Sequence, residues 1–374
     1  MATNNNNKAL NVPHLRFPEF TEEWETKPIN DLAVVIGGGT PDTTVKSYWD
    51  GKIQWFTPSE IGKTKYVDSS LRTITEDGLN NSSAKRLPPN TILLSSRATI
   101  GECSLSLREC ATNQGFQSLV SKKCNVDFLY YLIQTKKNDL IRKSCGSTFL
   151  EISANEVRKI QVSIPSDVEQ QKIAGLLSLI DERIATQNKI IERLETLIKG
   201  ITQNITLHNK PNVRISECLE CTSSTLQESD ALRSGTYPVY GANGIVGYLD
   251  NYSTQDEAVY IIKDGSGVGT VSYVTGQCST TGTLNTLQAK EGYSLQYLYY
   301  ILKVFNFEPY KTGMAIPHIY FKDYGKAKIF CPSYTKQLQY ARLLSAIDGK
   351  VSTEQNSLAS LSLQKQYLLR QMFI

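Results

Sequence analysis

The chain has 374 residues, of which 40% are hydrophobic and 20% are charged, and its net charge is +4. That length suits two or three domains of about 100 to 200 residues each. It contains no run of about 18 apolar residues that could span a bilayer, and the opening MATNNNNKALN lacks the apolar stretch of a signal sequence. These features exclude a membrane-spanning protein and predict a cytoplasmic one, with residues 1–11 as a disordered lead-in.

Cysteine and histidine usage argues against a disulfide framework and against a metal centre. The eight cysteines are irregularly spaced, which is typical of reduced thiols. Cys218 and Cys221 form a single CxxC with no second pair at zinc-finger spacing, and the only histidines are His14, His208 and His318. We therefore expect no metal site, and few groups for general acid–base catalysis.

The strongest feature of the sequence is an internal repeat. GSTFLEISANEVRKIQVSIPS at 146–166 matches GMAIPHIYFKDYGKAKIFCPS at 313–333, an offset of 167 (313 − 146 = 167), and LYYLI at 129–133 matches LYYIL at 298–302. The first offset also pairs Pro165 with Pro332, Gln170 with Gln337, Ala174 with Ala341, Leu177 with Leu344, Ile180 with Ile347 and Asp181 with Asp348. A repeat of this extent predicts two similar domains.

A long helical pattern follows each repeated proline, with apolar residues in steps of three and four. The first stripe comprises Ile173, Leu177, Ile180, Ile184, Ile191, Leu194, Ile198, Ile201 and Ile205. The second comprises Tyr340, Leu344, Ile347, Val351, Leu358, Leu361, Leu368 and Met372. Both stripes have a polar break, at Gln187 and Glu354, and Lys365 is the one further departure. Each helix of about 35 to 40 residues would reach roughly 50 to 60 Å.

The two stripes have the same spacing of apolar residues and the same polar break, so the simplest arrangement is that the two helices bury these stripes against each other. A single amphipathic helix usually packs on its own domain, but here a lone narrow stripe would stay exposed. Because each helix follows a similar domain, a pseudo-twofold axis predicts an antiparallel intramolecular coiled coil. We expect target domains at 12–165 and 209–332, and long helices at 166–208 and 333–374.

The segments between the helices have the pattern of mixed α/β domains. Short β-type runs such as TILLSS from Thr91 and AVYIIK from Ala258 lie between glycine, proline and asparagine signals. Near the end of each segment, DFLYYLIQTKKNDLIRK and LQYLYYILKVFNF have the apolar spacing of a helix. We predict loop-rich sheets, each covered on one face by a helix.

Motifs for nucleotide or metal chemistry are weak. KDGSGVGT at 263–270 has neither the ending of a P-loop nor the spacing of a dinucleotide fingerprint, so a tight turn is the better interpretation. GKT at 62–64 lacks the required glycine, because position 57 is Thr57. Asp42, Asp50 and Lys52, with the adjoining Pro41, loosely match a nuclease pattern that could hold a metal. A metal-dependent nuclease and a coiled-coil protein-binding scaffold thus stay open as alternative functions.

Loops rich in Gly, Ser, Thr, Asn, Lys and Tyr recur in both domains, and their chemistry suits phosphates and base edges. They include GGGTPD at 37–42, TNQG at 112–115 and YGANG at 240–244. The predicted DNA-contacting residues are Lys52, Thr57, Ser59, Lys63, Arg97, Asn113, Gln114, Ser147, Tyr240, Asn243, Lys263, Ser266, Thr281, Lys311 and His318. No catalytic residue is predicted.

The sequence resembles the specificity subunits of type I restriction-modification enzymes along nearly its whole length. The pieces that carry the resemblance are LRFPEF at 15–20 with Trp24, GGTPD followed by YWDGKIQWFTPSEI, EQQKIAGLLSLIDERI at 169–184, and YPVYGANGIVGY. The resemblance implies a non-catalytic subunit that reads a bipartite double-stranded DNA sequence, one half-site per domain. The helices would set the spacing between the half-sites.

The same resemblance implies partners, and it places the cofactors in them. Two methyltransferase subunits would dock on the paired helices and supply the S-adenosylmethionine chemistry, since this chain has no NPPY-like motif. Two restriction subunits that use ATP and Mg would join for cleavage. The departures KQLQYARLL at 336–344 and Lys365 leave the expected fold intact but predict different partner contacts for the second helix.

Overall fold

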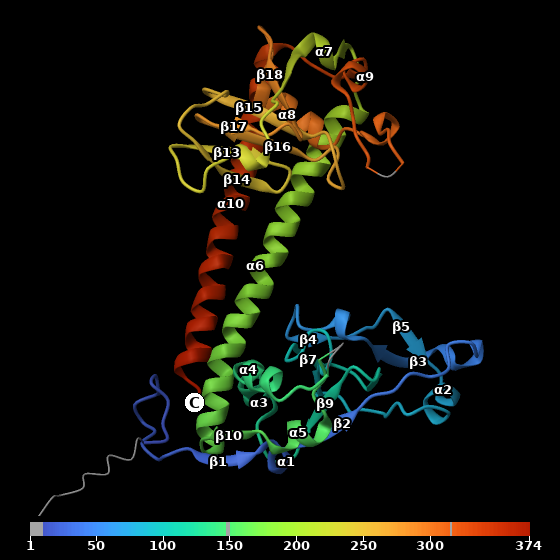
Figure 1. Cartoon of the computed structure of the whole chain (residues 1–374), viewed down its shortest axis with the longest axis vertical. Helices are drawn as coiled ribbons and strands as arrows, with labels where there is room; N and C mark the ends of the chain where they lie inside the picture. Colours follow the sequence, from blue (N-terminus) through green and yellow to red (C-terminus); the bar gives the residue numbers. More distant parts are fainter. Residues whose placement is uncertain (1–9, 147–149, 315) are drawn as a thin grey trace, which may run out of the picture. The chain divides into compact units, whose positions relative to one another are not determined.

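The computed structural model describes residues 10–146, 150–314 and 316–374, so all but the last two residues of the expected lead-in lie outside the described residues. The chain forms two compact units: unit 1 comprises Met1–Asn188 and Ser357–Ile374, and unit 2 comprises Lys189–Asn356. Each unit contains one globular head together with segments of two long helices, α6 (Asp167–Leu207) and α10 (Tyr334–Gln371) (Figure 1).

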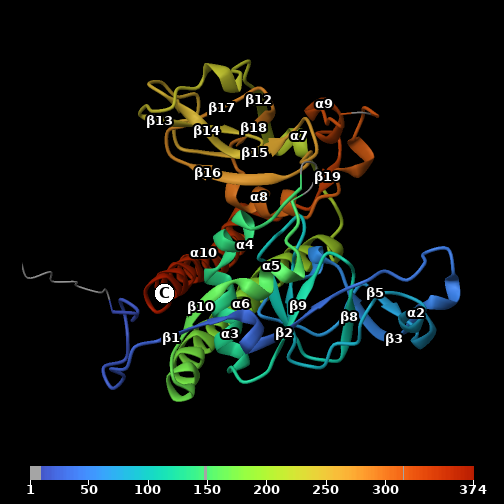
Figure 2. The same cartoon turned by 60° about the horizontal axis from the view of Figure 1, so that its bottom comes forward.

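The first head, in unit 1, is a mixed α/β structure. Its sheets have the strand orders β2-β9-β6-β7-β4, β5-β3-β8 and β1-β10. The strands are β1 (Glu25–Pro28), β2 (Ala33–Gly37), β3 (Trp49–Phe56), β4 (Tyr66–Val67), β5 (Arg72–Ile74), β6 (Ile92–Leu94), β7 (Cys103–Ser106), β8 (Cys110–Thr112), β9 (Gln117–Ser121) and β10 (Gln161–Ile164). The helices are α1 (Ile29–Leu32), α2 (Glu76–Asn80), α3 (Val126–Thr135), α4 (Lys137–Arg142) and α5 (Ala154–Lys159), with short 3-10 turns at Lys46–Tyr48 and Pro58–Glu60. Figure 2 shows the β5-β3-β8 sheet and α2 on the side of this head away from α6.

The core of unit 1 lies where α3 meets the five-stranded sheet and α6. The Asn125 side chain accepts a hydrogen bond from the Phe128 N–H and so caps α3. Buried α3 residues such as Phe128 and Leu132 share one cluster with Leu119 of β9 and Leu177 of α6. Burial of each such side chain contributes about 1.5–3 kcal/mol, which fixes the head to the helix.

The far end of α10 completes this same core. Phe373 is buried, and its ring lies 6.3 Å from the Trp24 ring and 5.3 Å from the Phe128 ring, between centroids. The Leu15 N–H donates to the Gln371 carbonyl at 2.8 Å. Residues more than 200 positions apart in the sequence therefore form one hydrophobic core.

The second head, in unit 2, has the same kind of architecture. Its sheets have the orders β12-β18-β15-β16, β14-β13-β17 and β11-β19. The strands are β11 (Val213–Arg214), β12 (Leu219–Ser223), β13 (Tyr237–Gly241), β14 (Gly244–Leu249), β15 (Glu257–Ile262), β16 (Val271–Thr275), β17 (Ser279–Thr280), β18 (Leu284–Ala289) and β19 (Lys328–Ile329). The helices are α7 (Ile215–Cys218), α8 (Leu295–Lys303) and α9 (Phe321–Tyr324), with 3-10 turns at Glu228–Asp230 and Glu308–Tyr310. The Ser294 hydroxyl caps α8, which packs on β15, β16 and β18.

Each head begins and ends on one short antiparallel ladder. In unit 1, β1 pairs with β10, so that Glu25 lies opposite Ile164. In unit 2, β11 pairs with β19, so that Val213 lies opposite Ile329. Because the chain enters and leaves each head at adjacent points, each head is an insertion into the frame of long helices.

The two long helices pair in antiparallel fashion. In unit 1, Asp181 of α6 forms an ion pair with Lys365 of α10. In unit 2, residues 195–202 of α6 and 348–355 of α10 line one common cavity. Numbers thus rise along one helix as they fall along the other, and the predicted fold class of two mixed α/β domains with paired long helices is confirmed.

The residues of the apolar stripes are buried or half-buried. Ile173, Leu177, Ile180, Ile191, Leu344 and Val351 are buried, and Ile184, Leu194, Tyr340, Ile347, Leu358 and Leu361 are half-buried. The residues of the polar breaks, Gln187 and Glu354, are half-buried as well. The heptad pattern read from the sequence therefore describes the packed face of each helix.

Candidate functional site

A glycine-rich loop at 37–42 is fixed rigidly on the surface of the first head. The Trp55 indole N–H donates to the Gly39 carbonyl at 2.9 Å, and the Trp49 indole N–H donates to the Asp42 carbonyl at 3.1 Å. A Cβ on Gly38 would lie 2.0 Å from the Asn113 carbonyl oxygen, so only glycine allows the loop this close to the TNQG segment. Two predicted contact loops are thereby held side by side.

The TNQG segment presents its two amide side chains differently. The Asn113 Oδ1 accepts from the Gly115 N–H at 2.8 Å, which leaves its amide nitrogen without a partner among the described residues. Gln114 is exposed, and its Oε1 accepts from the Thr40 hydroxyl at 2.5 Å. Both amide groups keep donors that could meet a base edge or a phosphate.

The neighbouring predicted residues divide into capping groups and exposed cations. Thr57 donates its backbone N–H and its hydroxyl to Glu60, at 2.7 and 2.6 Å, so its polar groups organise the 3-10 turn that holds Ser59. Lys52 on β3 and Lys63 beyond the turn are exposed. The lysines can attract phosphates, whereas Thr57 serves the local structure.

In the second head, the β13–β14 hairpin presents Asn243 at its tip. Asn243 is exposed, and Gly244 next to it has φ +102°, which a residue with a Cβ rarely adopts. Burial raises the pKa of Tyr240, which is half-buried at the base of the hairpin. Thr281 is buried and shares a hydrogen bond with the Thr283 hydroxyl at 2.7 Å, so its hydroxyl does not reach the surface.

At an equivalent place in each head, isolated β-bridges join segments that are distant in sequence, and we call the described residues at these bridges the neck. Neck 1 comprises Arg97, Cys145, Gly146 and Glu151, where Glu151 forms β-bridges with both Cys145 and Arg97. Neck 2 comprises Asp264, Thr312, Gly313 and His318, where His318 forms β-bridges with both Thr312 and Asp264. Four of the predicted residues, Lys263, Ser266, Lys311 and His318, belong to neck 2 or lie within two residues of it in sequence. Arg97 belongs to neck 1, and Ser147 lies outside the described residues.

The partners of Arg97 and His318 were not predicted. Arg97 Nη2 lies 2.8 Å from Glu151 Oε2, and His318 Nδ1 lies 3.8 Å from Asp264 Oδ1. The signal was available in the repeat, because the 167-residue offset that aligns the two halves takes Arg97 to Asp264 and Glu151 to His318 (264 − 97 = 167; 318 − 151 = 167).

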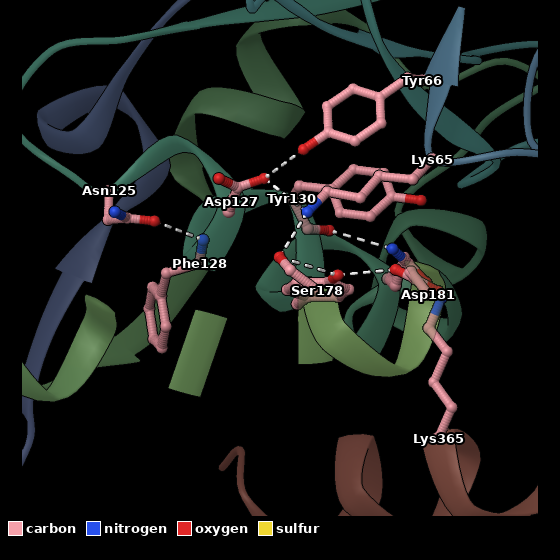
Figure 3. Close-up of polar contacts among 11 residues, drawn as sticks. Lys65, Tyr66, Asn125, Asp127, Phe128, Tyr130, Ser178, Asp181 and Lys365 are labelled. Atoms are coloured by element: carbon pink, nitrogen blue, oxygen red, sulfur yellow. Dashed lines mark hydrogen bonds and ion pairs between the residues drawn. The ribbon is translucent and has the colours of Figure 1, made fainter. Parts of the chain in front are cut away.

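A polar network joins the first head to α6 (Figure 3). Lys65 is buried, and its ammonium group lies 2.6 Å from Asp127 and donates to the Ser178 hydroxyl of α6 at 2.7 Å. The same ammonium group lies 4.9 Å from the centroid of the Tyr131 ring, which adds a cation–π contact. A buried lysine with these partners is a structural anchor rather than a phosphate contact.

The network continues from α6 to α10. The Tyr131 hydroxyl donates to Asp181 at 2.6 Å. Lys365 of α10 lies 2.7 Å from Asp181 (Figure 3). Burial raises the pKa of Tyr131, and the neighbouring Asp181 carboxylate raises it further, so the phenol stays a donor. Lys365, which interrupts the apolar stripe, thus has a specific partner.

One contact recurs almost atom for atom in the two units. Gln170 Oε1 accepts from the Asn125 N–H at 3.0 Å, and its amide donates to the Pro165 carbonyl at 3.0 Å. Gln337 Oε1 accepts from the Ser294 N–H at 2.9 Å, and its amide donates to the Pro332 carbonyl at 2.9 Å. Each glutamine satisfies backbone groups that are buried or half-buried where the long helix begins beside its head.

The alternative nuclease pattern is not assembled as a site. Asp42 accepts hydrogen bonds from the Thr44 hydroxyl and backbone N–H, at 2.7 and 2.9 Å, and these bonds hold the pKa of Asp42 below its usual value. Within residues 10–146, 150–314 and 316–374, no group of three or more Cys, His, Asp or Glu side chains is arranged to hold a metal ion. Over the same residues, none of the helices combines the length and hydrophobicity needed to cross a membrane.

Comparison with known proteins identifies relatives along the whole chain. The type I restriction modification DNA specificity domain matches twice, at residues 21–196 and 210–363. The MjaIX specificity subunit of a type I restriction enzyme from Methanocaldococcus jannaschii is 38% identical over 191 residues, which span 50% of this chain and 44% of that relative. The EcoprrI specificity subunit from Escherichia coli is 25% identical over 376 residues, which span 93% of this chain and 92% of that relative.

Solved structures show the same fold. The crystal structure of a type I restriction-modification S subunit from M. genitalium has a TM-score of 0.64 to this chain at 18% identity, and the match covers 97% of this chain and 99% of that one. A chain from a study of complex assembly and conformational transition in the type I R-M system has a TM-score of 0.54 at 16% identity and covers 92% of this chain and 96% of its own length.

Proposed function

This chain belongs to the type I restriction-modification DNA specificity domain family and recognises DNA sequence without catalysing a reaction, and we propose that its two heads each read one half of a bipartite double-stranded target. The heads would be the segments 12–165 and 209–332, carried by long helices at 166–208 and 333–374. The observation that carries the proposal is the recurrence, at one offset, of the same neck in both heads. Two equivalent surfaces on one chain fit a target with two half-sites.

Within each head, we assign different roles to the lysines and to the side-chain amides. Lys52 and Lys63 in the first head, and Lys263 and Lys311 in the second, would contact phosphates and give salt-dependent affinity. The exposed amides of Gln114 and Asn243 would contact base edges, where a good bidentate contact discriminates by about 1–3 kcal/mol.

The remaining predicted contacts are Thr57, Ser59, Arg97, Asn113, Ser147, Tyr240, Ser266, Thr281 and His318, of which Thr57 and Thr281 would act through local structure.

The long helices would set the distance between the half-sites and dock two methyltransferase subunits. The positions assigned to this role are Ile173, Leu177, Ile180, Ile184, Ile191, Leu194, Tyr340, Leu344, Ile347, Val351, Leu358 and Leu361, and their burial or half-burial supports the assignment. S-adenosylmethionine would act in the methyltransferase subunits, and ATP and Mg in two restriction subunits that join for cleavage. The assembly would bind its double-stranded DNA target in the cytoplasm.

The test is methylation of a randomised DNA library by this chain co-expressed with its methyltransferase, with the chain omitted as control. We expect a split motif of fixed spacing that appears only when this chain is present. A matched pair of variants assigns the roles: Gln114→Ala should relax one base position, whereas Lys63→Ala should weaken all sites and lower the salt slope by about 1. A stable complex that gives no chain-dependent methylation would contradict the proposal.

A further inference from the structure

The two necks are the same structure in the two heads. Gly146 and Gly313 occupy equivalent places and both have positive φ, +135° and +89°. The Ile152 N–H donates to the Ser96 carbonyl at 3.1 Å, and the Ile319 N–H donates to the Lys263 carbonyl at 3.0 Å. Equivalent backbone hydrogen bonds therefore join the segments of each neck.

The side chains that close the necks have opposite polarity. In neck 1 the cation belongs to Arg97, on the segment that follows β6, and the anion is Glu151. In neck 2 the anion is Asp264, on the segment that follows β15, and the side chain that can carry a positive charge is the imidazole of His318. An electrostatic attraction between two side chains is unchanged when the signs are exchanged, whereas a contact to a base edge depends on which group is the donor.

The contacts of Arg97 also argue against a role in base recognition. Its Nη2 is engaged by Glu151 at 2.8 Å, and its Nε is buried with no hydrogen-bond partner among the described residues. The turn beside it is held by the Thr99 N–H and the Ser95 hydroxyl, which both donate to the Arg97 carbonyl. One edge of the guanidinium group is thus occupied by the Glu151 carboxylate.

We infer that Arg97–Glu151 and Asp264–His318 are positioning pairs, which hold the two necks closed and do not themselves read bases. The inference rests on the proposed function and assigns a role to each of the two pairs. Because the pairs act through their mutual attraction, either polarity serves. The bases recognised by each head then depend on neighbouring groups, such as Gln114 and Asn243.

Exchange of the charges tests the inference. In the complex with the methyltransferase, Arg97→Glu and Glu151→Arg alone should each weaken binding to the cognate duplex by about tenfold or more. The double variant R97E/E151R should return to within about threefold of the original affinity, with the methylated motif unchanged. In the second head, D264R/H318E installs the polarity of neck 1 and should likewise preserve the motif.

A matched control is the exposed pair Arg108–Asp68 in the same head, with its closest atoms 2.6 Å apart. The variant R108E and the exchanged pair R108E/D68R should leave affinity and motif unchanged. If R97E or E151R does not fold, the neutral set R97Q, E151Q and R97Q/E151Q replaces them. If the two residues act as a positioning pair, R97Q/E151Q should bind the cognate duplex no more weakly than either single variant.

Three outcomes would overturn the inference: single neck variants with unaltered affinity, a double variant as weak as the singles, or a motif that changes in the half-site of the altered head. If Arg97 contacted a base, the double variant would bind as weakly as the single variants and the motif of that half-site would change. Failure of the proposed function is distinguishable, because then the unaltered complex itself methylates no split motif.

Discussion

In each unit, α6, α10 and the head meet around one aspartate, and the contacts of this aspartate differ between the two units. In unit 1, Asp181 is bound by Tyr131 and Lys365. In unit 2, the equivalent Asp348 is beside Tyr300, and the position of Lys365 is taken by the buried Ile198. Asp348 has no ion-pair partner within the part of the chain that the structure describes, and it lines a cavity of about 540 Å³.

The comparison teaches that one helix register can be held by two kinds of contact. Tyr300 keeps a raised pKa for the same reasons as Tyr131, namely burial and the adjacent carboxylate. The difference lies in the helix opposite, where a lysine fills the space in unit 1 and a shorter isoleucine leaves it open in unit 2. The following substitutions test whether that single exchange accounts for the difference.

Lys365→Ile gives unit 1 the arrangement of unit 2 and should have the largest effect. Asp181 and Lys365 are only 13% and 18% exposed, so removal of the lysine leaves a largely buried carboxylate unpaired. We expect a loss of about 2–3 kcal/mol in the free energy of unfolding. All three tryptophans lie in unit 1, so urea unfolding followed by tryptophan fluorescence measures this unit alone.

The control is Arg142→Ala, which removes an exposed ion pair with Asp139 in the same unit. Its effect should stay below about 0.5 kcal/mol. An unchanged tryptophan transition in Lys365→Ile would show that the ion pair contributes nothing and that the two units are held alike.

Gln170→Ala and Gln337→Ala probe the feature that the units share, and their effects should be equal. Each substitution leaves a backbone N–H and a carbonyl, each buried or half-buried, without their partners, at a cost of about 2 kcal/mol. Gln170→Ala should shift the tryptophan transition, whereas Gln337→Ala should shift only the transition seen by far-UV circular dichroism. Unequal losses would mean that the repeated contacts are not equivalent, and the exposed Gln203→Ala serves as reference.

Ile198→Lys makes the reverse exchange in unit 2 and should have the smallest effect. The loss of a buried isoleucine is offset by an ion pair with Asp348, so the free energy of unfolding should change by less than about 1 kcal/mol. In an Asp348→Asn background, the same substitution should cost about 2 kcal/mol. Equal costs in both backgrounds, measured by circular dichroism, would refute the pairing.

The sequence alone predicts the repeat, the long helices and the class of the heads, because these depend on local periodicity and on similarity at a fixed offset. It marks Lys365 as a departure but cannot identify Asp181 as its partner, since that contact depends on the antiparallel pairing of distant helices. In the same way, Arg97 and Glu151 are 54 positions apart and meet only through the folded head (151 − 97 = 54).

Predictions for single side chains are limited by competing local bonds. Thr281 and Thr57 have the composition expected of a nucleic-acid contact, yet their hydroxyls are engaged by Thr283 and Glu60. Hydrogen bonds of this kind depend on turn geometry that a residue list does not contain.

The division of unit 1 along the chain determines the order in which the two units can form during synthesis. Unit 2 is one continuous segment, and its contacts are available once Asn356 has left the ribosome. Unit 1 begins with the first head but needs Ser357–Ile374, including the Phe373 that packs on Trp24. The head that is translated first is therefore the one whose core is completed last. Until Ser357–Ile374 has been synthesised, the apolar residues that this segment covers stay exposed to solvent.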